Sequence, residues 1–475
     1  MSEWDIVVIG GGGAGLVAAI TAAEQGARVV LFESEEELGG STQLSAGVFN
    51  AAGTRVQATL KVEDSVDALY HHYMDLNQWR LQPGLIRTFC EQATPTLEWL
   101  ISLGVEVPAT LSGDAHTPGL YKAGVESIPR GHVPVDQGLG IVQALDRERR
   151  RLGVEAILGT RVERLLFEDG RVTGVVADGL EVEVDAVVVA SGGFAHNRDL
   201  VAELYPQALK AGDDLFVVAA PGSRGDAIEL GREVGADLAG QGWGLLLVTA
   251  YFQRYHHWQS GFPPKSRVYV DSSGRRFIDE DASYAIAAGI FEDHGGWGWA
   301  IFDETARNGL AAGYADWTPT RIEEEVREGR SHRADSLEEL ARIIDVPAEN
   351  LLTTVQRWNQ QLPDGEDPDF LRHVTLVDHA VDPHCDPIAT PPFYAVRVLP
   401  DQLVCTHAGL RIDASARVLD TTGRAIPGLY AAGEASGGIL GERYVGGGNS
   451  IASALTFGRI AGRTAAHKVA ARTSR

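Results

Sequence analysis

The feature that most constrains the fold of this chain is a complete dinucleotide-binding βαβ pattern between Asp5 and Glu33. An apolar run, Ile6–Ile9, leads into a glycine-rich turn at residues 10–15, which opens an apolar helix, and a second strand at 27–32 ends at Glu33. A strand, a Gly-x-Gly-x-x-Gly turn, a helix and a terminal acid in this order are typical of a Rossmann-like fold that binds a nucleotide cofactor. The pattern alone does not separate FAD from NAD.

The glycines of this turn have distinct physical roles. Gly10 permits the tight turn out of the strand, Gly12 lets backbone amides approach a pyrophosphate, and Gly15 lets the helix pack closely. The pyrophosphate then faces the helix N-terminus, whose unpaired N–H groups favour an anion. Glu33 suits a ribose hydroxyl and disfavours a 2′-phosphate.

Composition narrows the class of protein. At 475 residues the chain is too long for one core and should divide into two or more domains. Its 41 Lys+Arg and 65 Asp+Glu give a net charge of −24, which disfavours nucleic acid or an anionic membrane surface as a partner. Cys90, Cys385 and Cys405 form no CxxC pattern, so we expect no metal site, iron–sulfur cluster or attached haem.

Targeting signals are absent from the sequence pattern. The first strand begins near residue 5, and no apolar run has the length of a membrane span. We therefore expect a cytoplasmic protein without a membrane span.

Further elements of a nucleotide fold follow along the chain. A loop at 38–47 is rich in glycine and hydroxyl groups, whose donors suit a diphosphate or a ring edge. Apolar spacing predicts helices at 65–76, 85–103 and 139–152. Alternation predicts a β-meander over 162–184, with a turn at Asp169 and Gly170.

Two more strand ends are candidate cofactor contacts. The unbroken apolar run at 186–190 predicts a strand buried on both faces, ending at Ser191, Gly192 and Gly193. Near the end of the chain, a short strand at 428–434 ends in Glu434. A glycine-rich segment at 446–451 then opens a helix, whose N-terminus can lie against the pyrimidine edge of a flavin.

Together these motifs resemble the FAD flavoproteins of the fumarate reductase and 3-ketosteroid dehydrogenase superfamily. The resemblance includes residues 39–42, the Gly-Arg-Arg-Phe motif at 274–277 and the closing segments at 432–434 and 447–449. It implies an α/β fold with a Rossmann-like FAD-binding domain of the glutathione reductase type, formed by 1–244 and 405–475. An α+β cap or catalytic domain at 245–404 would interrupt it.

The resemblance also implies specific FAD contacts. Glu434 should hold the ribityl chain, and the backbone of Val162 should meet the adenine. Residues 38–54 contain no histidine for a covalent link, so we expect noncovalent FAD. The full set of expected FAD contacts is Gly10, Gly12, Ala14, Gly15, Glu33, Gly40, Ser41, Thr42, Ser45, Gly47, Val162, Ser191, Gly192, Gly433, Glu434, Asn449, Ser450 and Ile451.

Catalytic positions divide this superfamily into two branches. Fumarate reductases have an arginine where this chain has Tyr284, and ketosteroid dehydrogenases have a tyrosine there. The dehydrogenases place a second tyrosine just before a triple glycine, as Tyr444 stands before residues 446–448. Cys405 replaces a histidine of the fumarate reductases. The resemblance therefore favours the ketone dehydrogenase branch.

A two-tyrosine site suits desaturation beside a carbonyl. Tyr444 and the Gly448 N–H would stabilise the carbonyl oxygen as it gains negative charge, an arrangement worth roughly 3 kcal/mol per donor. Tyr284 would take the α-proton, and because the pKa of a free tyrosine is about 10, its surroundings must lower that pKa or a second group must relay the proton. Tyr121, His407 and Cys405 are candidates for this helper.

The sequence leaves three functions open. The first is an FAD-dependent dehydrogenase of a 3-ketosteroid or a smaller cyclic ketone, which passes electrons to a quinone or another external acceptor. The second is a fumarate or urocanate type of enoate reductase, and Arg443 keeps a carboxylate-bearing substrate open. The third is a flavoprotein subunit that relays electrons to a partner.

The aromatic and histidine cluster at 251–258 would line a pocket or pack at a domain interface.

Overall fold

The computed structural model describes residues 3–123, 125–254, 264–310, 316–362, 365–378 and 381–473, which fall into two compact units. The first unit comprises Met1–Gln207, Ala219–Leu245 and Val404–Arg475, and the second comprises Ala208–Val218 and Leu246–Leu403. Residues 208–218, expected in the FAD-binding domain, belong to the second unit because β12 (Phe216–Val217) pairs there with β18 (Phe393–Thr406).

A six-stranded sheet with the order β20-β21-β11-β1-β2-β7 forms the centre of the first unit. All neighbouring strands are parallel except β20 and β21. Every residue of β1, β2 and β11 is buried, as in a sheet covered on both faces, and each buried Val or Ile contributes about 1.5–3 kcal/mol. This is the predicted Rossmann-like α/β fold. Its strands are β1 (Ile6–Ile9), β2 (Val29–Phe32), β7 (Glu155–Ile157), β11 (Ala186–Val189), β20 (Arg417–Leu419) and β21 (Ala425–Ala431).

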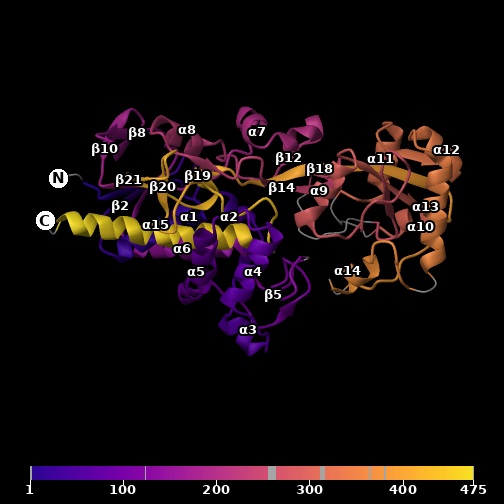
Figure 1. Ribbon diagram of the computed structural model, residues 1–475, viewed down its shortest axis with the longest axis horizontal. Helices are drawn as coiled ribbons and strands as arrows, with labels where there is room; N and C mark the ends of the chain where they lie inside the picture. Colours follow the sequence, from indigo (N-terminus) through magenta and orange to yellow (C-terminus); the bar gives the residue numbers. More distant parts are fainter. Residues whose placement is uncertain are drawn as a thin grey trace. The chain divides into compact units, whose positions relative to one another are not determined.

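The first and last helices of the unit, α1 (Gly13–Glu24) and α15 (Asn449–Thr473), lie side by side (Figure 1). The two helices contact each other through backbone atoms, because glycines of α15 face α1. A Cβ added at Gly458 would overlap the carbonyl oxygen of Ala14, and one added at Gly462 would overlap that of Ala18. This contact brings the first and last helices together next to the glycine-rich turn at residues 10–15.

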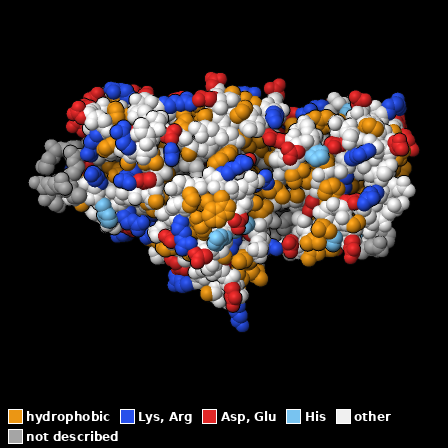
Figure 2. All heavy atoms as spheres, in the orientation of Figure 1, with side chains coloured by type: hydrophobic (Ala, Val, Ile, Leu, Met, Phe, Trp, Pro, Cys, Tyr) orange, Lys and Arg blue, Asp and Glu red, His pale blue; other side chains and the backbone are white. Residues whose placement is uncertain are grey.

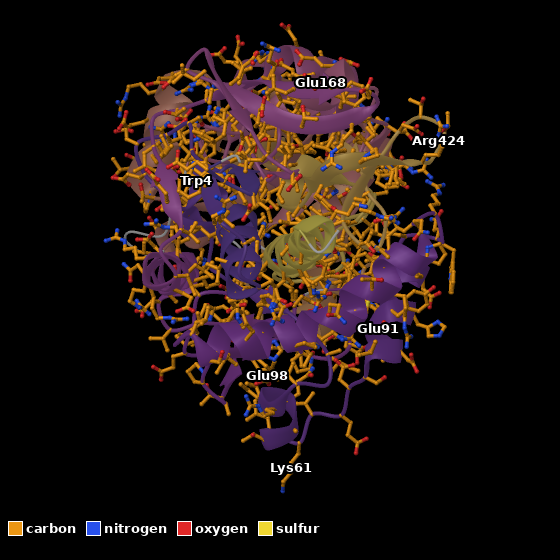
Figure 3. All side chains as sticks on the ribbon, turned by 90° about the vertical axis from the view of Figure 1, so that its left-hand side faces the viewer. Trp4, Lys61, Glu91, Glu98, Glu168 and Arg424 are labelled. Atoms are coloured by element: carbon orange, nitrogen blue, oxygen red, sulfur yellow. The ribbon has the colours of Figure 1, made fainter. Side chains whose placement is uncertain are left out.

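The predicted β-meander consists of β8 (Val162–Glu168), β9 (Arg171–Ala177) and β10 (Leu180–Glu183). Asp169 and Gly170 both have positive φ, 49° and 74°, as the first tight hairpin requires. In Figure 3, Glu168 marks the meander, and Glu91 and Glu98 mark helix α5 (Pro83–Ser102).

The three predicted helices form close to their expected bounds. Ser65 caps α4, since its hydroxyl accepts a hydrogen bond of 3.1 Å from the Ala68 N–H. The remaining helices of the unit are α2 (Gly40–Leu44), α3 (Arg55–Thr59), α4 (Val66–Leu76), α5 (Pro83–Ser102), α6 (Gln137–Arg151), α7 (Arg198–Leu204), α8 (Asp226–Glu233) and the short η3 (Gly433–Ala435).

Two small sheets complete the first unit. One has the order β3-β6-β5-β4 and the other β13-β19-β22. Their strands are β3 (Phe49–Asn50), β4 (Leu111–Ser112), β5 (Gly119–Tyr121), β6 (Gly131–Val133), β13 (Leu238–Ala239), β19 (Gly409–Arg411) and β22 (Ser436–Gly437).

The second unit is α+β and is organised around the long strand β18, which pairs with β12, β14, β16 and β17. The Gly-Arg-Arg-Phe motif has a structural role here, because the Arg276 guanidinium binds both Glu280 (2.6 Å) and Asp367 (2.8 Å). Its other elements are η1 (Pro206–Asp214), β14 (Gly244–Ala250), β15 (Val268–Val270), α9 (Tyr284–Asp293), β16 (Gly298–Asp303), α10 (Glu304–Asn308), α11 (Pro319–Arg327), β17 (His332–Ala334), α12 (Leu337–Ile343), α13 (Ala348–Gln361) and α14 (Arg372–Asp378). Helices α12 and α13 pack against each other.

Acidic and basic side chains are interspersed over the face shown in Figure 2. Within the described ranges, no helix combines the length and the apolar character needed to cross a bilayer.

The close approach of α15 to α1 yields a stability prediction. Gly462→Ala should lower the free energy of unfolding by about 1–3 kcal/mol, because the added methyl forces two helices apart. Gly289→Ala in α9 is the matched control, since an added Cβ there meets nothing within 4 Å. The control should be stabilised by about 0.5–1 kcal/mol, the ordinary preference for Ala in a helix. Urea unfolding measures both changes, and equal stabilisation by the two substitutions would contradict the packing described here.

Candidate active site

The turn between β1 and α1 is shaped by contacts that only glycine permits. Gly10 has a φ of 101°, and a Cβ there would overlap the carbonyl oxygen of Ala190 at the end of β11. A Cβ on Gly15 would overlap the carbonyl oxygen of Gly10. Helix α1 begins at Gly13, whose N–H donates to the Thr42 hydroxyl at 3.2 Å, and its N-cap residue Gly12 supplies no side-chain cap. The turn therefore presents backbone donors to an anion.

Glu33 lies at the end of β2, and its carboxylate is buried against this turn. Its Oε2 accepts a hydrogen bond of 2.6 Å from the Gly11 N–H, and its Oε1 accepts one of 2.9 Å from the Glu35 N–H. These bonds fix the carboxylate beside the glycine-rich turn, where the sequence predicted a ribose contact.

A cleft of about 440 Å³ lies over the carboxyl ends of β1, β2 and β11. Segments far apart in the sequence form its walls, as expected at such strand ends. The predicted FAD contacts that line it are Gly10, Gly12, Ala14, Glu33, Gly40, Ser41, Thr42, Val162, Ser191, Gly192, Gly433, Glu434, Ser450 and Ile451. No histidine is among the described residues that line the cleft.

The other four predicted contacts, Gly15, Ser45, Gly47 and Asn449, are not among the residues that line the cleft. The Ser45 hydroxyl donates to the Thr42 carbonyl at 2.8 Å, so it supports the wall formed by α2. The expected loop at 40–44 is helical, and the N-terminus of this short helix begins at the cleft.

The sequence analysis missed one wall of the cleft, residues 220–223. The Ala220 N–H donates a hydrogen bond of 3.0 Å to the Ser41 hydroxyl, which joins this wall to α2. A Pro-Gly pair at 221–222 is its only local signal, and such a pair indicates a turn but no ligand.

Two observations test whether these residues suit FAD. The Ser191 hydroxyl lines the cleft and is buried without a hydrogen-bond partner among the described residues, so it has capacity for a ligand. The bare backbone of the first turn leaves room for a diphosphate, because an added Cβ at Gly12 would meet nothing closer than the Gly39 carbonyl oxygen at 3.9 Å. The donor set and the open backbone therefore fit a dinucleotide.

Glu434 is a buried carboxyl group at the opposite wall. Its Oε1 accepts hydrogen bonds from the Thr406 N–H (2.6 Å) and the Thr406 hydroxyl (2.8 Å). Burial raises the pKa of this carboxyl group, and the two Thr406 donors oppose that shift.

Tyr444 belongs to a buried polar cluster at the same end of the cleft. Its phenol oxygen accepts hydrogen bonds from the Ser450 N–H (2.8 Å) and the Ser450 hydroxyl (3.0 Å). Because its oxygen takes both Ser450 donors, the phenol acts toward other groups as a donor. Burial raises the pKa of Tyr444, which keeps the phenol protonated.

Cys405 and His407 extend this cluster. Cys405 lines the cleft, and its Sγ lies 3.4 Å from His407 Nε2 and 3.7 Å from the Ser450 hydroxyl. His407 Nδ1 lies 2.7 Å from the Gly441 carbonyl, which assigns the ring proton to Nδ1 and leaves Nε2 to accept from the thiol. Burial raises the pKa of Cys405 and lowers that of His407 to about 4, so both are neutral.

The triple glycine after Tyr444 packs against the first half of the chain. Gly448 has a φ of 84°, and a Cβ there would overlap the carbonyl oxygen of Val48. The ring of Tyr121 lies beside Gly447, 2.9 Å from an added Cβ. Burial raises the pKa of Tyr121, so this tyrosine is also a neutral phenol.

Three further candidates belong to other segments of the chain. Tyr284 is the first residue of α9 in the second unit, directly after the capping residue Ser283. Arg443 has an exposed side chain, and its backbone N–H donates to Asn77 at 3.0 Å. Within the cluster at 251–258, Tyr251 and Phe252 pack in the core of the second unit, while 255–258 lie outside the described residues.

Comparison with known proteins relates this geometry to a family. A sequence profile described as FAD binding domain matches residues 5–451. The chain is 32% identical to an NADH:acrylate oxidoreductase of Vibrio harveyi, over 98% of this chain and 50% of that protein. It is 30% identical to a fumarate reductase (cytochrome) of Shewanella frigidimarina, over 97% of this chain and 77% of that protein. The chain thus spans half the length of the first relative.

Similarity extends to ketone dehydrogenases. The chain is 27% identical to a 4-oxocyclohexanecarboxylate 2-dehydrogenase of Sinomonas cyclohexanicum, over 99% of this chain and 94% of that protein. A solved 3-ketosteroid-Δ4-(5α)-dehydrogenase from Rhodococcus jostii RHA1 superposes with a TM-score of 0.79 at 27% identity, over 98% of both chains.

The neutral state of His407 yields a prediction on acid stability. Its folded-state pKa of about 4 lies below the ordinary value of about 6.5, so the unfolded chain binds the proton first as the pH falls. The stability that the neutral ring provides is present above about pH 6.5 and is lost towards about pH 4. The difference in unfolding free energy between wild type and His407→Gln should therefore shrink over this range.

Urea unfolding at several pH values measures this difference. His71→Gln, at an exposed position, is the control for the substitution itself. A constant effect of His407→Gln would show that the ring is not held neutral.

Proposed function

This chain belongs to the FAD binding domain family and to the superfamily of fumarate reductases and 3-ketosteroid dehydrogenases, and from this premise we propose that it is a cyclic ketone dehydrogenase. The chain is an FAD-dependent oxidoreductase. In the proposed reaction, a C=C bond forms beside the carbonyl of a 3-ketosteroid or a smaller cyclic ketone. The electrons pass to a quinone or another external acceptor.

The main support for this proposal is the hydrogen bonding and the raised pKa of Tyr444. The Ser450 N–H and hydroxyl hold its oxygen in place and burial raises its pKa, and in the proposed role its O–H donates to the carbonyl oxygen of the substrate. The Gly448 N–H would be the second donor, from a backbone that the Val48 contact holds in the left-handed region. Preorganised donors of this kind stabilise the charge that develops on the carbonyl oxygen.

The proton and the hydride leave from adjacent carbons of the substrate. By the family resemblance, Tyr284 takes the α-proton. When bound, FAD supplies the acceptor for the β-hydride. Glu33, Ser191 and Glu434 would hold the cofactor in the cleft that they line, with Glu434 toward the ribityl chain.

The names of the relatives support both a ketone and an acid as substrate. The ketone dehydrogenase of S. cyclohexanicum is named for a cyclic ketone that bears a carboxylate, while the relatives from Vibrio and Shewanella are named for acrylate and fumarate. The alternative function is therefore an enoate reductase. The residues Tyr284 and Cys405, at positions where the fumarate reductases use arginine and histidine, favour the ketone.

Reduction of the bound flavin tests this function. Anaerobic addition of saturated ketones, both 3-ketosteroids and substituted cyclohexanones, should bleach the absorption band of the oxidised flavin, and succinate should not. Tyr444→Phe should slow this bleaching by about a hundredfold or more, because it removes one donor to the carbonyl oxygen. Tyr284→Phe should abolish it.

The control is Tyr430→Phe, a buried tyrosine of the central strand β21 that has no role in the proposed reaction. This variant should bleach at the wild-type rate. If no ketone bleaches the flavin, and fumarate or another enoate reoxidises the chemically reduced enzyme, the chain would instead be assigned to the reductases.

A further inference from the structure

A fully buried carboxyl group, Glu126, lies under the triple glycine that follows Tyr444. Its Oε1 accepts a hydrogen bond of 2.7 Å from Asn50 Nδ2, and its Oε2 accepts one of 3.1 Å from the Ala123 N–H. A Cβ added at Gly446 would overlap Glu126 Oε1. The carboxyl group is thus in direct contact with the start of the loop.

Asn50 connects Glu126 to the rest of this loop. The same Asn50 Nδ2 donates to the Gly447 carbonyl at 3.3 Å, and the Asn50 backbone N–H donates to the Gly448 carbonyl at 3.4 Å. Since a shared amide holds both the carboxyl group and the loop carbonyl, the position of the Gly448 N–H depends on the Glu126–Asn50 pair.

Among the described residues, Arg130 is the cation whose charge acts on Glu126, but Arg130 forms a bidentate pair with Asp64 at 2.8 Å and 2.9 Å, and both side chains of that pair are buried. The other titratable groups that face Glu126 are Tyr121 and Tyr444, both neutral phenols. Burial raises the pKa of Glu126 to about 8, and the charges of Arg130 and Asp64 act on it in opposite directions.

We propose that Glu126 is a positioning residue of the oxyanion site: through Asn50 it holds the Gly446–Gly448 backbone, and in its neutral form it keeps negative charge away from that loop. The proposal rests on the proposed function, in which the Gly448 N–H faces a developing oxyanion. An ionised Glu126 would place a second negative charge beside that oxyanion and weaken its binding. Glu126 acts through the loop and does not itself touch the substrate.

Binding of a phenolate tests this inference without catalysis. The probe is 3,4-dinitrophenol, whose planar oxyanion resembles an enolate and which is ionised over the pH range used. Titration of the FAD-loaded protein, followed by the visible absorption of flavin and probe, gives the Kd of the wild type and of Glu126→Gln. At about pH 6 the Kd values of the wild type and of Glu126→Gln for the phenolate should agree within about twofold, because both side chains are neutral.

At about pH 9.5 the wild type should bind the phenolate about tenfold more weakly than Glu126→Gln, because only the wild type gains a charge near the loop. Glu98→Gln, on the periphery of the first unit (Figure 3), is the control and should follow the wild type at every pH. If the ratio of the Kd values of wild type and Glu126→Gln does not change with pH, the proposed effect of the Glu126 charge on phenolate binding is wrong.

A second variant tests the positioning role. Asn50→Asp loses the donor to the Gly447 carbonyl and brings a second carboxyl group against Glu126, so phenolate binding should fall by at least tenfold at every pH. Retained FAD and an unchanged Tm of the variant would show that it is folded. Wild-type affinity in this folded variant would overturn the link through Asn50.

Failure of the two proposals would look different. If no ketone bleaches the flavin but phenolate binding weakens above about pH 8 in the wild type alone, the role of Glu126 stands and the ketone function falls. If ketones are oxidised and the ratio of wild type to Glu126→Gln does not vary with pH, the function stands and the role of Glu126 falls.

Discussion

The close approach of bare backbone segments at the β1–α1 turn is the constraint on which the first unit depends. Gly10 lies against Ala190 of β11, Gly15 against Gly10, and Gly458 of α15 against Ala14. A side chain at any of these glycines would overlap a carbonyl oxygen. Three segments separated by more than a hundred residues therefore meet because a glycine stands at each of these contacts. Their meeting forms the cleft, with strand ends and helix N-termini around one space.

Burial determines the protonation states at this end of the cleft. Tyr444, Cys405 and His407 all lose the solvation of their charged forms, so the phenol and the thiol keep their protons and the imidazole stays neutral. A cluster of neutral donors suits a reaction in which negative charge appears briefly on a substrate oxygen. The proposed neutral state of Glu126 follows the same physical rule.

The similarity to both reductases and dehydrogenases has a chemical basis. Hydrogen transfer between a saturated carbon pair and a flavin runs in either direction, and the group that stabilises the activating carbonyl or carboxylate decides the substrate. A neutral phenol and a backbone amide suit a ketone oxygen, which gains only partial charge. A carboxylate would instead favour a guanidinium, which binds both of its oxygens. The relatives named for acrylate and fumarate are thus consistent with a shared fold and a different binding site.

The sequence by itself determined the local elements of this protein: the βαβ turn, the hairpin at Asp169 and Gly170, the helices α4 to α6 and the glycine-rich segments that line part of the cleft. These follow from glycine positions and apolar periodicity, which act over a few residues. Only the tertiary structure decided the wall at 220–223, the membership of 208–218 in the second unit and the contacts of Glu126 and Asn50 with the triple glycine. A buried polar side chain has no local signature, because its partner and its protonation state depend on residues that folding brings to it from distant parts of the chain.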